Sequence, residues 1–132
     1  MTPRRLSTLV LAAILTLTLV TTNAGATTET VTSGTLSVRF TYHGDAPQSR
    51  SSRLVISQGG KTLYDQLVRS RWCGLQCAPN VIAGARTVVH IVRFQSAGPT
   101  VVVLDLYSGG AHCCSVEQVY WYNAAAITLG AH

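Results

Sequence analysis

Apolar and polar residues alternate along several short runs of the chain. Between residues 35 and 42 every second position is apolar, at Leu36, Val38, Phe40 and Tyr42. A period of two predicts a strand with one buried and one solvated face. Two further β-rich runs, 54–57 and 62–68, flank a segment with two adjacent glycines, which is typical of a tight hairpin turn. This part of the chain therefore predicts antiparallel strands.

Two longer apolar runs, 88–94 and 101–107, follow an irregular stretch. Both faces of the second run are largely apolar, which predicts a central strand covered on both sides, and Asp105 within it then needs a polar partner. Residues 115–123 predict the last clear strand, and 108–114 the turn before it. Because no stretch has a helical period, we expect an all-β fold: a small antiparallel sheet or sandwich, or a partial propeller-like sheet.

The first twenty-six residues have the pattern of an export signal. Arg4 and Arg5 precede an uncharged stretch whose most apolar part, 9–20, is too short to span a bilayer comfortably. Ala24 and Ala26 provide the small-x-small spacing that signal peptidase accepts. We predict a signal peptide at 1–26 with cleavage after Ala26, and the alternative is an uncleaved N-terminal membrane anchor. The mature chain is then secreted, to the periplasm, the cell envelope or the medium, with no membrane span of its own.

The remaining chain is divided by composition. Residues 27–34 are rich in threonine and poor in apolar side chains, which favours a flexible lead-in. The β domain is expected at 35–123. Residues 124–132 form an Ala-rich tail that resembles neither a strand nor a capped helix.

Charge argues against nucleic acid as a partner. Ten basic residues less Arg4 and Arg5 leave eight after Ala26, against five acidic residues, a net charge of +3. A nucleic-acid surface would cluster its basic residues with aromatic residues between them. We therefore expect a protein or cell-envelope ligand and a non-catalytic binding or envelope role.

Export places all four cysteines in an oxidising compartment, where two disulfides are expected. They are Cys73, Cys77, Cys113 and Cys114. A bond between the adjacent pair is disfavoured, because neighbouring Cα atoms lie about 3.8 Å apart and disulfides usually need roughly 4.4 to 6.8 Å. We therefore expect crosswise pairing of the two sites, in either of its two arrangements. A crosswise bond would close a loop of about forty residues and stabilise the fold by about 3 to 5 kcal/mol.

The same sulfurs allow a different function. His112, Cys113 and Cys114, with Cys73 and Cys77 nearby, offer imidazole and thiolate ligands to zinc or copper(I). Adjacent cysteines are poor chelating geometry for one tetrahedral ion, so we expect no metal or other cofactor. A redox role through a strained adjacent disulfide is a third interpretation, although the chain has no C-x-x-C motif.

Catalytic residue types are present without an activating context, so we do not expect an enzyme. Ser108 lacks the G-x-S-x-G elbow and is followed by another predicted strand. His90 lies in an apolar run, and His43 lies at a strand end. Asp105 and Glu117 are expected to face each other across the last hairpin, but so small a domain has little room for a substrate cleft.

One block carries a family resemblance. Residues 103–114, Val-Leu-Asp-Leu-Tyr-Ser-Gly-Gly-Ala-His-Cys-Cys, resemble a segment of bacterial secreted proteins of the FG-GAP and VCBS-like type. The block is specific and covers 12 of the 106 residues that follow Ala26, about a ninth of the mature chain, and the resemblance implies a secreted β protein. These proteins often carry an Asp-rich, calcium-type loop before the block. The corresponding residues 93–100 contain no carboxylate, so calcium is not carried over.

The resemblance also bears on the end of the domain. The similar proteins continue into further β structure where this chain has its Ala-rich tail. If the strand at 115–123 lacks a neighbour, its unpaired edge favours an edge-strand dimer. A full propeller needs more residues than this chain has.

Overall fold

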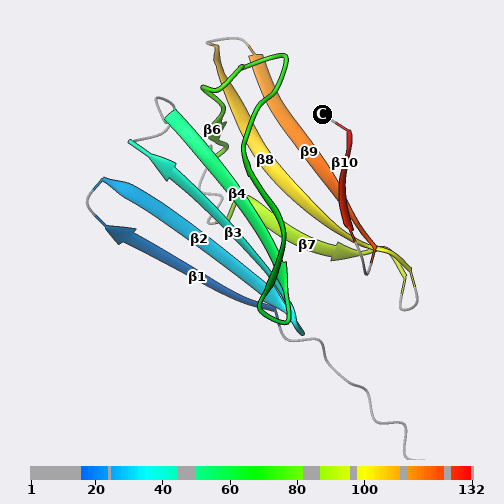
Figure 1. The fold of residues 1–132 in the computed structure, drawn as a ribbon. Coiled ribbons are helices and arrows are strands. Elements are labelled where there is room, and N and C mark those ends of the chain that lie inside the picture. The colour runs from blue at the N-terminus through cyan, green and yellow to red at the C-terminus, as the bar shows by residue number, and fades with distance from the viewer. Residues whose placement is uncertain are drawn as a thin grey trace, which may run out of the picture.

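The computed structural model describes residues 16–23, 25–44, 50–81, 87–95, 98–110, 113–123 and 126–131. These residues form two antiparallel sheets and no helix, which confirms the predicted all-β class as a two-sheet sandwich (Figure 1). The strands are β1 (Thr16–Asn23), β2 (Ala26–Ser33), β3 (Leu36–His43), β4 (Arg50–Gln58), β5 (Lys61–Leu67), β6 (Ala78–Pro79), β7 (Val89–Arg93), β8 (Thr100–Gly110), β9 (Cys113–Asn123) and β10 (Ala126–Ala131).

The first sheet is a meander with strand order β1-β2-β3-β4-β5. The predicted hairpin between 54–57 and 62–68 is confirmed as β4 and β5. Gly59 and Gly60 form its turn with φ values of 55° and 82°, a conformation that glycine adopts without the steric cost of a Cβ. The backbone nitrogen of Gly59 donates to the Thr35 carbonyl at 2.9 Å, which fixes this turn beside the β2–β3 turn.

The second sheet has the order β10-β9-β8-β6, and β7 also pairs with β8. Strand β8 is therefore central, as predicted, and Leu104 and Leu106 on its inner face are fully buried. The predicted turn at 108–114 is too long, because β8 continues to Gly110 and Gly110 pairs with Cys113 of β9.

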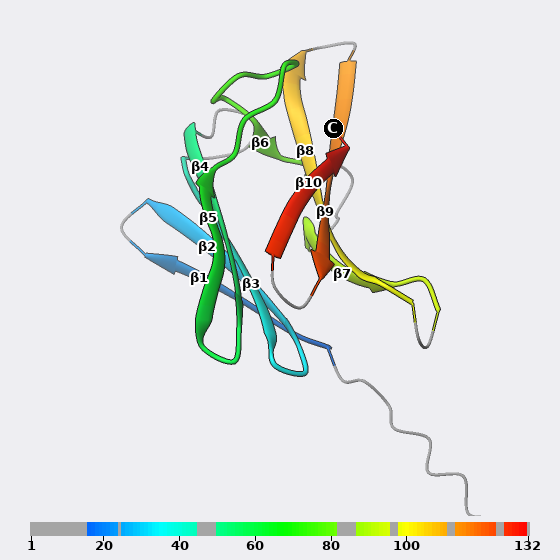
Figure 2. The ribbon, with the colours of Figure 1, turned by 45° about the vertical axis from the view of Figure 1, so that its right-hand side comes forward.

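The core lies between the inner faces of the two sheets, which Figure 2 shows as separate layers. Phe40 and Ile56 from the first sheet and Leu104 and Tyr120 from the second are among its fully buried side chains. Each buried side chain of this size is worth about 1.5 to 3 kcal/mol relative to exposure. The sandwich is thus stabilised by alternate residues of paired strands, and the opposite residues remain on the outer faces.

The lead-in predicted at 27–34 is wrong. Residues 27–33 belong to β2, which pairs with β3 along its whole length, and its Val31 is only 4% exposed. Structure thus begins before Thr35. The sequence did not reveal this strand because β2 has one apolar core residue, and its place depends on backbone pairing with β3.

The structure also differs from the prediction in the tail at 124–132, which was expected to form neither a strand nor a helix. Residues 126–131 form β10, which pairs with β9 and packs Ile127 against the core. The Trp121 indole ring lies over Gly130, so a Cβ at this position would meet the ring unless the ring moved. Strand β9 therefore has a neighbour, and the unpaired edge expected for it is absent from this part of the described chain.

Strand β1 comes from the predicted signal peptide. It pairs with β2 over eight residues at the outer edge of the first sheet (Figure 1). The side chains of residues 16–22 are exposed, with Leu17 at 64% and Leu19 at 59%. The signal peptide and its cleavage stay predictions, and cleavage after Ala26 would remove a strand that contributes backbone pairing but no core. Among the described residues no helix is long and apolar enough to cross a membrane.

Candidate functional site

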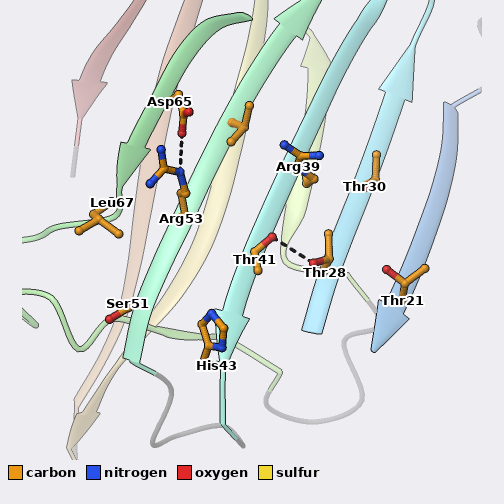
Figure 3. A pocket seen from close by; sticks show the side chains of 11 residues that line it. Thr21, Thr28, Thr30, Arg39, Thr41, His43, Ser51, Arg53, Asp65 and Leu67 are labelled. Atoms are coloured by element: carbon orange, nitrogen blue, oxygen red, sulfur yellow. Dashed lines mark hydrogen bonds and ion pairs between the residues drawn. The ribbon is translucent and has the colours of Figure 1, made fainter. Parts of the chain in front are cut away.

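A shallow hollow of about 620 Å³ lies on the outer face of the first sheet. Its lining side chains come from adjacent strands and point to one side of the sheet, as Figure 3 shows. On β3, Arg39, Thr41 and His43 alternate with Val38, Phe40 and Tyr42, which lie in the core or pack against it. The register places Arg53 of β4 opposite Thr41, and Thr28 of β2 opposite Thr41 on the other side. Alternation along each strand and the register between strands thus gather these groups on one surface.

Two arginines and one carboxylate determine the charge of the hollow. Arg53 Nε donates to Asp65 Oδ1 at 2.6 Å. This hydrogen bond holds the pKa of Asp65 below its usual value, and the charges of Arg53 and Arg39 act in the same direction. The charge of Asp65 is balanced by its ion pair with Arg53. The lining therefore keeps an excess of positive charge at Arg39.

Hydroxyl groups surround the arginines. The Thr28 and Thr41 hydroxyls are hydrogen-bonded to each other at 3.0 Å, and Thr30 lies opposite Arg39 in the register (Figure 3). Ser51 lies at one end of the hollow with a φ of 56°. The surface is therefore suited to a ligand that carries both hydroxyls and negative charge, which arginine binds with paired hydrogen bonds.

Sequence reasoning missed this surface as a site. His43 was interpreted only as a residue at a strand end, and it is the last residue of β3 and lines the hollow. The usable signal was the outward face of the predicted strand at 35–42, where Arg39 and Thr41 alternate with the apolar residues. Their neighbours on β2 could not be found, because the sequence predicts a flexible lead-in at these residues.

A second polar cluster lies on the second sheet. His90 Nε2 and Asp105 Oδ2 are 3.1 Å apart, which supplies the partner that Asp105 was expected to need. The predicted pairing of Asp105 and Glu117 across the β8–β9 hairpin is confirmed by the register. Both His90 and Asp105 are part-exposed, so the pair is a surface pair of a kind that contributes little to stability.

Glu29 is a buried carboxylate that no pattern in the sequence singles out. It is 4% exposed, and its two oxygens accept hydrogen bonds of 3.1 Å from the backbone nitrogen of Val88, one of them also from that of Val89. Burial raises the pKa of Glu29, and the two backbone donors oppose that shift. Since Glu29 belongs to the first sheet and Val89 to the second, this carboxylate joins the two layers.

The disulfide in the structure corrects the expected crosswise pairing. Cys73 is bonded to Cys77, with the Cα atoms 5.0 Å apart. The chain reverses here, because Gly74 adopts a φ of 57° and its nitrogen donates to the Ser70 carbonyl at 2.6 Å. That turn brings two cysteines four residues apart into bonding distance. So short a loop stabilises by about 2 kcal/mol on the chain-entropy relation, less than the crosswise bond expected from the sequence.

The disulfide also removes two of the ligands expected for the alternative metal site. Cys73 and Cys77 are bonded to each other and are not thiolate ligands in this state. No group of three His, Cys, Asp or Glu side chains suited to a metal occurs among the described residues. His112 and the side chains of Cys113 and Cys114 lie outside the described part of the chain, so their metal or redox role stays a prediction.

A hollow of about 500 Å³ lies where β5 faces the second sheet. Tyr64 and Tyr120 line it with their rings 5.2 Å apart in an edge-to-face arrangement, together with Arg69 and Leu129. Tyr120 is 1% exposed, so most of its ring belongs to the core and not to an open surface. The hollow on the outer face of the first sheet is thus the better candidate site.

The resemblance of residues 103–114 to secreted FG-GAP and VCBS-like proteins stays a prediction. No protein-family model matches the chain, and no curated protein or solved structure matches it significantly.

Proposed function

We propose that this protein is an exported, non-catalytic binding domain that holds a negatively charged, hydroxyl-rich ligand, such as an acidic polysaccharide of the cell envelope, on the outer face of its first sheet. Export is supported by the basic, apolar and small-residue pattern of residues 1–26 and by the resemblance of residues 103–114 to secreted proteins. The Cys73–Cys77 disulfide is consistent with an oxidising compartment.

The observation that carries the proposal is the unbalanced charge of the hollow. Arg53 is engaged by Asp65, whereas Arg39 lies among threonine hydroxyls on the same surface. The hollow is broad and open and spans several strands, which suits an extended chain better than a small molecule (Figure 3). All lining residues except Thr21 follow Ala26, so the surface persists after the predicted cleavage.

Arg39→Ala is expected to weaken binding of an alginate oligosaccharide by about 10- to 100-fold, because a hydrogen-bonded charge of this kind is worth about 1.5 to 3 kcal/mol. Isothermal titration calorimetry on the purified protein measures the affinity. Lys61→Ala is the matched control, since it also removes one positive charge but lies on the first sheet outside the hollow. A neutral dextran oligosaccharide is the ligand control, and added salt should weaken alginate binding further.

Equal losses in Arg39→Ala and Lys61→Ala would show that binding follows net charge and would contradict a site at the hollow. Absence of alginate binding by the unmodified protein, or equally tight binding of dextran, would contradict the proposed ligand class.

A further inference from the structure

The edge of β2 is covered by β1, and β1 is the strand that the predicted cleavage removes. The β1–β2 ladder runs without a register shift from Asn23 opposite Ala26 to Thr16 opposite Ser33. Removal of residues 1–26 leaves β2 as the edge of the first sheet, with the rest of the sandwich unchanged in its core contacts. This inference therefore rests on the export and cleavage that we proposed above.

The hydrogen-bonding groups that become free on β2 can be assigned. The Gly44 nitrogen donates to the Gly25 carbonyl at 3.1 Å, so Gly25 and Gly44 are a hydrogen-bonded pair of the β2–β3 ladder. In an antiparallel ladder such pairs alternate with pairs that are not hydrogen-bonded. The odd-numbered residues of β2 therefore bond to β3, and Thr28, Thr30 and Thr32 direct their backbone groups toward β1.

We infer that a second copy of the mature chain pairs with this edge, antiparallel, about a two-fold axis at Thr30. Mature β2 comprises residues 27–33, and Thr30 is its centre. Only with the axis at Thr30 does the whole strand pair with its copy, with Thr28 opposite Thr32 and Thr30 opposite Thr30. In this register every backbone group released by the loss of β1 meets a partner, since each threonine donates one hydrogen bond and accepts one.

The side chains are self-complementary in the same register. On the outer face threonine meets threonine, a pairing in which hydroxyls form hydrogen bonds across strands. On the inner face Glu29 lies opposite Val31 of the second copy, so the two buried carboxylates do not oppose each other. A two-fold contact of this kind places one surface against itself, and that explains why a second copy fits the edge better than an unrelated strand.

The dimer also extends the proposed binding surface. Thr28 and Thr30 line the hollow of each copy, and the pairing places the two hollows on the same face of one continuous sheet. A polymeric ligand that occupies both hollows gains avidity without any new contact.

The test uses the full chain expressed with export and purified after processing. Mass spectrometry first establishes whether the chain begins at Thr27, and light scattering coupled to size exclusion over a dilution series then gives the mass in solution. We expect twice the mass of the processed chain. Thr30→Pro should return a monomer, because proline removes a donor toward the partner and spares the bonds to β3.

A charge pair tests the register without proline. Thr28→Lys with Thr32→Lys places like charges opposite each other across the proposed dimer, and Thr28→Glu with Thr32→Lys places opposite charges there. The first double variant should be monomeric and the second dimeric. Both alter the same two positions, so a folding defect at these sites would affect both.

The results distinguish a failure of the proposed dimer from a failure of the proposed processing. A processed chain that stays monomeric, or a dimer that both double variants leave unchanged, overturns the pairing while export stands. A chain recovered with Met1 attached overturns the proposed processing, and the dimer with it, because β1 then remains on the edge.

Discussion

Glu29→Ala is expected to lower the free energy of unfolding by about 2 to 5 kcal/mol, because it leaves two buried backbone donors without an acceptor and each such group costs about 1 to 3 kcal/mol. The donors are the backbone nitrogens of Val88 and Val89, at the N-terminal end of β7. Urea unfolding of the purified protein at neutral pH measures the change. Glu117→Ala is the matched control, since Glu117 is exposed on β9, and it should change stability by less than about 0.5 kcal/mol.

Glu29→Gln separates the hydrogen bonds from the charge. A glutamine oxygen still accepts from both nitrogens, as one carboxylate oxygen does in the structure, so this variant should unfold within about 1 kcal/mol of the unmodified protein at neutral pH. A loss as large as that of Glu29→Ala would show that the charge itself, and not the acceptor, holds the layers together.

The pH dependence follows from the raised pKa of Glu29. The folded state binds this proton more tightly than the unfolded chain, whose Glu has its ordinary value of 4.5. The stability due to this proton is therefore greatest below pH 4.5 and is lost as the pH rises through the raised pKa of the folded state. His90 and Asp105 act on Glu29 with opposite signs and remain in both proteins. The unmodified protein should thus lose stability relative to Glu29→Gln as the pH rises, and parallel profiles would contradict a raised pKa.

Several of the predicted strands share one physical cause. In β3, β4 and β9 the side chains alternate between core and solvent, and that alternation is visible in the residues themselves. Strand β5 was predicted from the two glycines of its hairpin turn, and β8 from a run that is apolar on both faces. Strand β2 lacks that visible alternation, because one of its two buried inward residues is Glu29, whose partners are backbone groups about sixty residues away. A carboxylate satisfied by distant amides leaves no local pattern.

Contacts between strands account for the other differences. Strand β10 depends on its pairing with β9 and on the packing of Ile127 against the core, and the short disulfide depends on a turn at Gly74. The candidate site depends on register, since Arg39, Arg53 and Thr28 come from three strands. Local patterns predict which side of a strand faces solvent, but the neighbours that make a surface follow from pairing across the sheet.

Gln118 is a buried polar residue that links β9 to the segment after β5. It is fully buried, its Nε2 donates to the Arg69 carbonyl at 2.6 Å, and its Oε1 accepts from the Tyr120 hydroxyl at 2.8 Å. Burial, and after it the interaction with Tyr64, raises the pKa of Tyr120, so its hydroxyl keeps its proton and remains a donor. One side chain thus satisfies a donor and an acceptor at the edge of the core.

Gln118→Leu is expected to lower the free energy of unfolding by about 2 to 4 kcal/mol, because it conserves much of the volume but removes the acceptor of the Tyr120 hydroxyl and the donor to the Arg69 carbonyl. Gln66→Leu is the matched control on β5, where the side chain is exposed, and its effect should stay below about 0.5 kcal/mol. Adding Tyr120→Phe to Gln118→Leu removes the hydroxyl that has lost its Gln118 acceptor, so the double variant should be more stable than Gln118→Leu alone. Unfolding energies that simply add in the double variant would show that Gln118 and Tyr120 are not coupled, since residues joined by a hydrogen bond give non-additive losses.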